Sequence, residues 1–413
     1  MLFWCHSRRL IRVVPFVLLA LGLNKAYGAA QYYGGDIGVS ALSDDNYGLS
    51  TFAKNDVSGT SVQARGRVRW ETELSELDLS GRLVDENLNE DDVDENDVLQ
   101  VILQGNRRLE RGRITSRAAV IQDTTLADDA LSSGVTLVDV GRDRYSLALS
   151  GEYFFTETQG ASVSAYGEAV RFEEYSPTLS EYDYTSLDAR YLWAMHETLT
   201  AYISGVWSRI EYEDNVRLDL VLNGSFVPDR TNIESGSLGV NWTLADKWSL
   251  DASLGYRQTD YFGRYYFILF PATVYTLETE EEGDGRISNL SLQYQGERTL
   301  YTLSYYQEIL PNTSGLLIDE RRLEMVANTR LSENVRLNVR AYASEQRSEI
   351  DTDNRDNIDV AYGLMGFDWR FRKSLSVRGS YRYIYRRYIT SSNDTESNRV
   401  TLGLYWTPTP FEW

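Results

Sequence analysis

The sequence predicts an all-β protein: a transmembrane antiparallel up-and-down β-barrel of about 18 strands. Apolar and polar residues alternate along many segments of about ten residues, which is the period of a half-buried strand. Tight turns and longer acidic connections join these segments in alternation, as in outer-membrane barrels. The chain is rich in aromatic residues (29 Tyr, 13 Phe and 9 Trp), although its mean hydropathy is only −0.39. A pattern this regular and aromatic is not typical of disorder.

The first 28 residues are expected to be a cleaved signal peptide, so that a single barrel domain occupies residues 29–413. The segment has a basic start, an apolar run and a small-x-small cleavage site (Arg8, Arg9 and Arg12; Val13 to Leu23; Ala26-Tyr27-Gly28). The alternative is a membrane anchor, but an apolar run of about 11 residues is too short to span ~30 Å of hydrocarbon. Export to the cell outer membrane is therefore expected.

Removal of this segment would change the chemistry of the chain. The segment holds the sole cysteine, Cys5, so the mature chain is expected to form no disulfide. It also holds four of the 41 Lys and Arg residues and none of the 61 Asp and Glu residues, so its loss takes the net charge from −20 to −24. Nucleic acid is not an expected partner of so acidic a chain.

One hairpin plan recurs along the chain with different residues. In GVNWTLADKWSLDASLGYRQTDY, a strand ends near Trp242, a polar turn covers 245–247, and the next strand alternates from Trp248 to Tyr256. The plan returns in LWAMHETLTAYISGVW, NTRLSENVRLNVRAYASEQ and DWRFRKSLSVRGSYRYIYRRY. Turns of two to four residues between alternating strands are typical of β-hairpins.

The strands expected from this pattern number 18, and an even number returns both ends of the barrel to the same side of the membrane. Sixteen is the alternative, because the first and fifth are weak. The expected strands are 35–43, 59–71, 76–86, 98–109, 113–124, 144–156, 161–173, 184–194, 199–211, 235–244, 248–260, 286–295, 299–309, 321–331, 335–346, 358–371, 375–388 and 398–406.

The longer connections are mostly acidic. Examples are 85–97, 277–285, 350–357 and 390–397. Bacterial barrels place short turns in the periplasm and long loops outside the cell, so these acidic segments are expected on the cell surface.

Alternation also predicts which face of a strand meets lipid. From Leu375 to Tyr385 the odd-numbered residues are aliphatic, glycine or tyrosine, whereas Arg378 and Arg382 lie among the even-numbered ones. An arginine that faces the bilayer midplane of a barrel costs ~2–4 kcal/mol, so these arginines must face a wet interior. In SVQARGRVRW (61–70) three arginines alternate with small or apolar residues in the same way.

Arginines on the predicted interior faces are the candidate pore-lining residues. They are Arg65, Arg67, Arg69, Arg257, Arg336, Arg340, Arg378, Arg382 and Arg386. Together they could form a basic track for an anionic solute. Alternatively, they pair with interior carboxylates and only stabilise the wall, and nearby acids such as Asp251 and Asp359 keep this interpretation open.

No enzymatic activity is predicted. After cleavage the sole histidine would be His196, which lies in an expected tight turn and has no nucleophile motif near it. The acidic run 85–97 lacks the glycine and glutamate positions of a calcium-binding EF-hand loop. No cofactor or metal site is therefore expected.

Three segments carry a resemblance to a known family. They are SDDNYGLS (43–50), LGYRQTDYFGR (254–264) and the closing hairpin GSYRYIYRRY…SNRVTLGLYW (379–406). The chain resembles the β-barrel porin type 2 family, exopolysaccharide-associated outer-membrane β-barrels. The resemblance implies an outer-membrane barrel with a role in polysaccharide export or surface assembly, and it supplies no catalytic residues. Barrels of this kind commonly end on an aromatic residue of the last strand, whereas TPTPFEW follows Trp406, so Trp406 and Trp413 both remain candidate assembly signals.

Three functions follow as expectations. The first is a conduit or assembly partner in exopolysaccharide export, with an anionic polymer as cargo. The alternatives are a general porin for small solutes and a structural or adhesive barrel with a filled lumen. The expected partners are outer-membrane lipid and lipopolysaccharide, the outer-membrane assembly machinery, polysaccharide and periplasmic export proteins.

Overall fold

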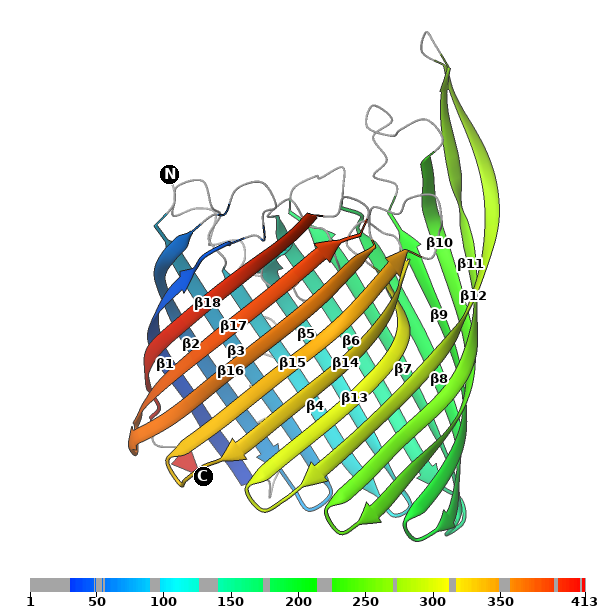
Figure 1. The fold of residues 1–413 in the computed structure, drawn as a ribbon. Helices are drawn as coiled ribbons and strands as arrows, with labels where there is room; N and C mark the ends of the chain where they lie inside the picture. The colour runs from blue at the N-terminus through cyan, green and yellow to red at the C-terminus, as the bar shows by residue number, and fades with distance from the viewer. Residues whose placement is uncertain are drawn as a thin grey trace.

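The computed structural model describes residues 30–47, 49, 54, 56–89, 97–125, 140–173, 179–213, 225–269, 273–311, 317–348, 357–389, 393–408 and 411–412. These residues form a closed antiparallel barrel of 18 strands (Figure 1). The predicted fold class and strand number are confirmed, and the alternative of 16 strands is wrong. The predicted signal peptide lies outside the described residues. Within them, no helix is long and apolar enough to cross a membrane.

The strands follow one another around the barrel in sequence order. They are β1 (Ala30–Asp44), β2 (Val57–Glu71), β3 (Ser75–Leu88), β4 (Val98–Leu109), β5 (Gly112–Thr124), β6 (Gly141–Phe154), β7 (Gln159–Phe172), β8 (Tyr182–His196), β9 (Leu199–Tyr212), β10 (Ser225–Ala245), β11 (Trp248–Leu269), β12 (Thr273–Gln295), β13 (Thr299–Pro311), β14 (Leu317–Arg330), β15 (Val335–Ser348), β16 (Ile358–Arg372), β17 (Leu375–Tyr388) and β18 (Asn393–Trp406). A two-residue strand, β19 (Phe411–Glu412), continues along β1 beyond the end of β18.

The barrel closes where β1 pairs with β18, from Ile37 opposite Trp406 to Asp44 opposite Arg399. Above this ladder, the segment that follows β1 is fastened to β18. The backbone N–H of Asn398 donates to Asp45 Oδ1 (2.7 Å), and Asn46 Nδ2 donates to the Glu396 carbonyl (2.9 Å). Asp45 and Asn46 therefore extend the contact between β1 and β18 beyond the ladder.

The two ends of the barrel differ. Short turns join the strands at the lower end in Figure 1, for example at Glu110–Arg111 and Lys373–Ser374, and β1 begins at this end because Ala30 pairs with Glu71. We assign this end to the periplasm because short turns lie there in outer-membrane barrels. The strand ends that flank the longer connections lie at the opposite end, which we assign to the extracellular side.

The outer face of the wall is apolar. Large exposed side chains on it include Ile37, Val39, Val62, Leu83, Leu147, Val163, Leu187, Ile203, Leu254, Leu303, Met325, Met365, Leu402 and Leu404. Tryptophans gather on this face near the short turns (Trp193, Trp242, Trp248, Trp369 and Trp406). An apolar belt with an aromatic girdle on a closed barrel is the arrangement that spans a membrane without unpaired backbone groups. The protein is therefore an outer-membrane barrel.

Strands β10 to β12 are much longer than the sequence predicted. They contain 21, 22 and 23 residues, and β11 pairs with β12 from Trp248–Tyr294 up to Leu269–Thr273. They rise above the rim at the upper right of Figure 1. The predicted acidic connection at 277–285 is wrong, because this segment is part of β12. Acidic residues could extend the strand there because it stands in water, where no apolar face is required.

Two other acidic connections are shorter than predicted. The segment 85–88 completes β3, and 393–397 opens β18. Residues 90–96, 350–356 and 390–392 lie outside the described residues.

The β13–β14 hairpin leaves the wall in its extracellular half. β12 pairs with β13 only between Ser288 and Gln295, whereas β13 and β14 stay paired with each other up to Pro311 and Leu317. Figure 1 shows β13 curving away from β12 at this level. Leu317 packs with Ile210, Ile233 and Tyr261, which lie on the inner faces of β9, β10 and β11. The extracellular part of this hairpin therefore bends into the interior of the barrel.

Candidate functional site: the interior of the barrel

The interior wall has two chemically different sides. From β7 to β13 many of the inward residues are serines (Ser162, Ser164, Ser186, Ser204, Ser208, Ser235, Ser237, Ser249, Ser253, Ser291 and Ser304). Several of these serines face one another across neighbouring strands and are hydrogen-bonded, as Ser204 with Ser237 (2.6 Å) and Ser208 with Ser186 (2.9 Å). We call this side the serine wall. It leaves room inside and presents hydroxyl groups to whatever occupies the lumen.

The opposite side runs from β14 through the closing seam to β3 and carries long arginines; we call it the arginine wall. The strand register places all nine predicted arginines on the inner face, Arg257 alone on β11 of the serine side and the other eight on the arginine wall. The structure thus places eight of them on one side of the interior. Most of these eight interact with carboxylates or other polar side chains.

Three arginines near β1 and β18 are held by carboxylates from distant parts of the chain. Arg378 donates to both oxygens of Asp36 (3.3 and 3.2 Å) and to Asp368 (3.0 Å). Arg382 donates to Asp44 (3.3 Å), which is 1% exposed. Arg399, which the sequence analysis did not single out, is paired with Glu86 (2.5 Å). Such buried pairing fixes the position of each guanidinium in the wall.

The remaining predicted arginines differ in their partners. Arg67 pairs with Asp78, Arg69 with Glu71 and Glu76, Arg340 with Glu324 (2.6 Å), and Arg257 with Asp319 (3.3 Å). Arg386 is 3% exposed and donates to the Tyr388 hydroxyl (3.2 Å). Arg65 lies opposite Arg82 in the register. Arg336 has no ion pair with any residue in the described part of the chain.

Sequence reasoning missed the carboxylate partners. Asp36, Asp44 and Asp78 share the inner face with the arginines, so strand alternation alone could have placed them in the interior. Their pairing could not be found that way, because Arg378 and Asp36 are 342 positions apart in the chain.

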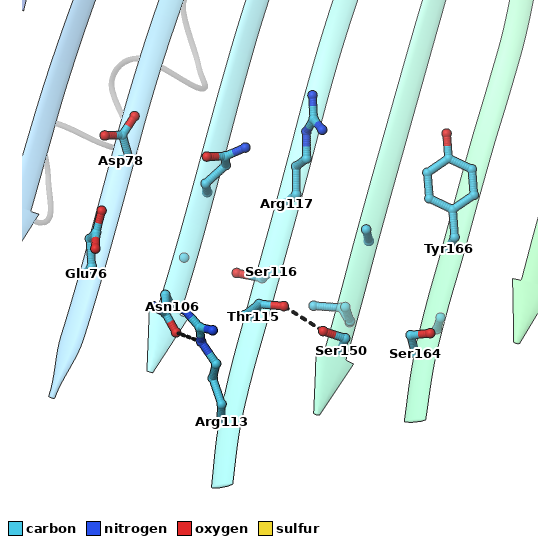
Figure 2. A pocket seen from close by; sticks show the side chains of 15 residues that line it. Glu76, Asp78, Asn106, Arg113, Thr115, Ser116, Arg117, Ser150, Ser164 and Tyr166 are labelled. Atoms are coloured by element: carbon cyan, nitrogen blue, oxygen red, sulfur yellow. Dashed lines mark hydrogen bonds between the residues drawn. The ribbon is translucent and has the colours of Figure 1, made fainter. Parts of the chain in front are cut away.

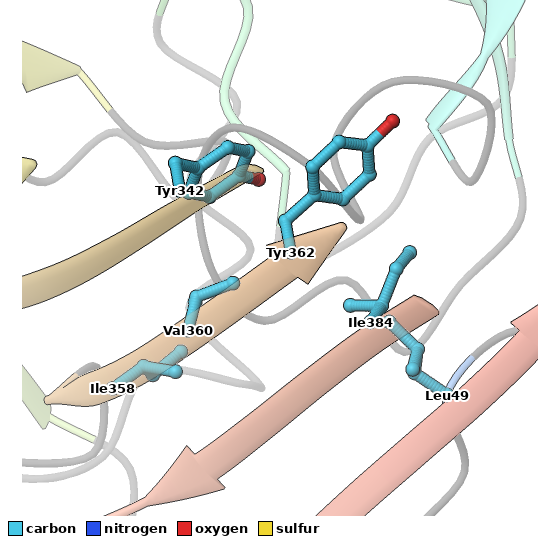
Figure 3. Close-up of a cluster of buried hydrophobic side chains, with 6 residues drawn as sticks. All are labelled: Leu49, Tyr342, Ile358, Val360, Tyr362 and Ile384. Atoms are coloured by element: carbon cyan, nitrogen blue, oxygen red, sulfur yellow. The ribbon is translucent and has the colours of Figure 1, made fainter. Parts of the chain in front are cut away.

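Apolar and aromatic groups fill part of the extracellular half of the interior. Leu49, Tyr342, Ile358, Val360, Tyr362 and Ile384 form one buried cluster (Figure 3). Leu49 reaches this cluster from the segment after β1 with a φ of 53°, a left-handed conformation that is uncommon for a residue with a side chain. The inward-bent β13–β14 hairpin forms the second cluster. Both clusters therefore occupy interior space in the extracellular half of the barrel.

A latch connects this hairpin to the wall. Arg257 is 2% exposed, and its guanidinium reaches Asp319 of β14 across Gly285 of β12, where a Cβ would lie 2.8 Å from the guanidinium carbon. Gln307 Nε2 also donates to Asp319 (3.1 Å). A side chain at 285 would displace Arg257, so glycine is required for the latch.

A polar groove of about 560 Å³ lies on the inner wall over β3 to β7 (Figure 2). Carboxylates, amides, hydroxyls and guanidinium groups line it, including Glu76, Asn106, Arg113, Arg117 and Tyr166. Arg113 Nε donates to Asn106 Oδ1 (2.9 Å), and Thr115 is hydrogen-bonded to Ser150 (2.6 Å). Groups of this kind can bind the hydroxyl and carboxylate groups of a sugar.

His196 lies at the end of β8, and its Nδ1 contacts the Thr198 hydroxyl (3.1 Å) in the exposed turn to β9. In the part of the chain that the structure describes, no three His, Cys, Asp or Glu side chains are grouped so that they could hold a metal ion.

Comparisons with known proteins show a similarity of fold and nothing more. No protein-family model matches the sequence, and no curated protein matches it. Similar solved structures include the ferric yersiniabactin uptake receptor FyuA of Yersinia pestis (12% identity, TM-score 0.44), a mutant of the ferric enterobactin receptor PfeA of Pseudomonas aeruginosa (8%, 0.46) and the outer membrane channel DcaP of Acinetobacter baumannii (12%, 0.43). These matches cover 90%, 91% and 93% of this chain, and 65%, 80% and 99% of the respective proteins. The chain thus spans just under two thirds of the first, and the likeness specifies no solute.

Proposed function

We propose that this barrel is an outer-membrane conduit in exopolysaccharide export and that its cargo is an anionic polymer. The observation that carries the proposal is the two-sided interior, in which a roomy serine wall faces a wall of positioned arginines. Hydroxyl groups can exchange hydrogen bonds with a sugar chain as it moves, and fixed guanidinium groups favour anions close to the wall. The resemblance of the sequence to exopolysaccharide-associated porins supports a role in polysaccharide export.

The charge of the whole chain does not oppose this proposal. Wall charges act within a Debye length of ~8 Å, whereas many of the acidic residues stand on the extracellular strands and connections, farther from the lumen. Glu278, Glu280 and Glu282, for example, are exposed on the part of β12 that rises above the rim. The local potential of the arginine wall can therefore differ in sign from the net charge of −20.

The test is ion selectivity. The reversal potential of the purified protein in planar bilayers under a salt gradient should show a preference for anions. Replacement of Arg378, Arg382 and Arg386 by glutamine should turn selectivity toward cations, because Asp36, Asp44 and Asp368 would then be left without their guanidinium partners.

The matched control removes the same charge from the outer face. Arg171, Arg209 and Arg387 point outward, and their side chains are 30%, 38% and 57% exposed. Their replacement by glutamine should leave selectivity unchanged, because the wall separates them from the lumen. Equal behaviour of the two triple variants would refute the basic track and leave the arginines as paired scaffold.

A general porin for small solutes is the second candidate. The two clusters that occupy interior space in the extracellular half favour it, because a polymer must pass this level. Oligomers of a uronic acid separate the two functions: a polymer conduit should show blocking events whose duration grows with oligomer length, whereas a small-solute porin should exclude all but the shortest. A complete lack of conductance would favour a structural or adhesive barrel.

The proposal includes partners at the outer face of the barrel and at its periplasmic end. Outer-membrane lipid and lipopolysaccharide would cover the apolar belt and the charged side chains above it, and the assembly machinery would insert the barrel. Periplasmic export proteins would deliver the polysaccharide to the short-turn end. The proposal requires no catalytic step and no cofactor.

A further inference from the structure

Two arginines face each other at the periplasmic mouth. Arg330 ends β14, Arg336 lies at the start of β15, and the strand register places them directly opposite each other. Both lie on the inner face, because Leu337 and Val339 beside Arg336 belong to the outer, apolar face. Arg370 of β16 lies on the same inner face, two positions from the partner of Arg336 in the register. All three side chains are exposed.

Like charges directly opposite on neighbouring strands destabilise a sheet unless another group compensates them. Compensation of this kind is present where Arg382 lies opposite Arg399, because Asp44 and Glu86 are paired with the two guanidinium groups. The pair of Arg330 and Arg336 at the mouth differs from that one. Within the described residues neither side chain, nor that of Arg370, has an ion pair or a side-chain hydrogen bond.

The nearby carboxylates are not paired with these arginines. Asp368 is the register partner of Arg336, but it accepts a hydrogen bond from Arg378 (3.0 Å). Glu333, in the turn between β14 and β15, is exposed and forms no ion pair with the described residues. Lys373 adds a further exposed positive charge in the next turn. The mouth thus holds an uncompensated cluster of cations in a chain of net charge −20.

We propose that Arg330, Arg336 and Arg370 form a carboxylate-binding site that captures uronate groups of an anionic polysaccharide at the periplasmic mouth. This inference rests on the proposed function and adds where the polymer is first bound. A guanidinium fork binds a carboxylate through two parallel hydrogen bonds, and an alternating chain of uronates can satisfy several forks at once. The inward orientation of the three side chains favours a ligand that enters the lumen over a protein docked on the rim.

The first experiment measures binding without conduction. The full-length barrel in detergent is titrated calorimetrically with a uronic acid oligomer, and a neutral oligomer of the same length serves as the control ligand. The variant Arg330→Gln, Arg336→Gln, Arg370→Gln should bind the uronate oligomer at least ~10-fold more weakly, since it loses the charge-assisted hydrogen bonds. The outer-face variant of Arg171, Arg209 and Arg387 should bind it like the wild type.

Thermal unfolding provides a second readout. Relief of the like-charge pair should raise the unfolding temperature of Arg336→Gln above that of the wild type at low salt. The uronate oligomer should then raise the unfolding temperature of the wild type but not that of the triple variant. A wild-type barrel that is not stabilised by the oligomer would overturn the inference, and this outcome needs no variant to fold.

Current block in planar bilayers separates the two proposals. Uronate oligomer added on the short-turn side should block the wild type at lower concentration than the triple variant, whereas addition on the opposite side should not distinguish them. Identical block of both from the short-turn side would refute the mouth site even if anion selectivity holds. Retained oligomer binding in a barrel that does not conduct would refute the conduit and keep the site. Stronger binding of poly-glutamate than of uronate would assign the site to an acidic protein and refute the polysaccharide.

Discussion

The side-chain alternation of β15 decides which of its residues can be replaced by a charged residue without a large loss of stability. On its outer face the apolar run extends from Val335 to Ala343, and Glu345 follows it. At ~3.3 Å per residue the run is ~26 Å long, and with a strand tilt of ~40° it spans ~20 Å along the membrane normal. Val339 is the centre of the run and therefore lies ~10 Å from either edge of the hydrocarbon.

We expect Val339→Arg to destabilise the barrel by ~2–4 kcal/mol, the cost of an arginine at the bilayer midplane. This corresponds to a ~30- to ~900-fold loss in the ratio of folded to unfolded protein. Val335→Arg, at the periplasmic edge of the same face, should cost only ~0–1 kcal/mol, because the guanidinium can reach water there. Asn338→Arg, on the inner face beside Gly366, should also cost less than ~1 kcal/mol because the interior is hydrated.

Equilibrium unfolding by guanidinium chloride in lipid vesicles gives the free energy of unfolding of the wild type and of each of the three variants. The differences from the wild type are the three costs. Equal costs for Val339→Arg and Asn338→Arg would refute the assignment of the two faces. Equal costs for Val339→Arg and Val335→Arg would refute the depth of the strand in the membrane.

The remaining predictions concern topology, the hairpin latch and assembly. Single cysteines at Asp92, Asp284 and Asp394 should react with an impermeant reagent on intact cells and one at Glu333 should not; the reverse pattern would invert the orientation. Arg257→Gln and Asp319→Asn should each raise single-channel conductance by releasing the β13–β14 hairpin from β11, and the double variant should add little to either; unchanged conductance would show that the hairpin does not limit the passage. Trp406→Ala should slow assembly more than deletion of residues 409–413, because Trp406 ends the β18 ladder with both β1 and β17 and is half exposed on the outer face; a stronger effect of the deletion would place the assembly signal beyond Pro408.

Much of the fold could be predicted because it depends on a local rule. In SVQARGRVRW the period of two puts Arg65, Arg67 and Arg69 on one face, and the cost of an arginine in lipid decides that this face is the interior. The same rule gave the phase of β17 and the number of strands. It failed for 277–285, where β12 has left the membrane and neither face has to be apolar.

The candidate site could be predicted only in part. Alternation placed all nine arginines on inner faces, but not the carboxylates that hold them, and it gave no sign that Arg336 differs from Arg378. The inward bend of β13 and β14 was also missed, because their residues alternate as in any strand and the bend is visible only in the packing of Leu317 against Ile210, Ile233 and Tyr261.

The sequence by itself determined the class of fold, the direction in which each strand turns its apolar residues and the residues that line the interior. Each of these three features follows from the alternation of neighbouring side chains and from the cost of charge in lipid. Neither of these two causes depends on contacts between distant parts of the chain. The tertiary structure decided which interior charges are paired, where apolar side chains fill the interior and which arginines have no ion pair among the described residues. Those features depend on pairs such as Arg378 with Asp36, whose separation in the chain is 342 residues and which come together only when β1 closes on β18.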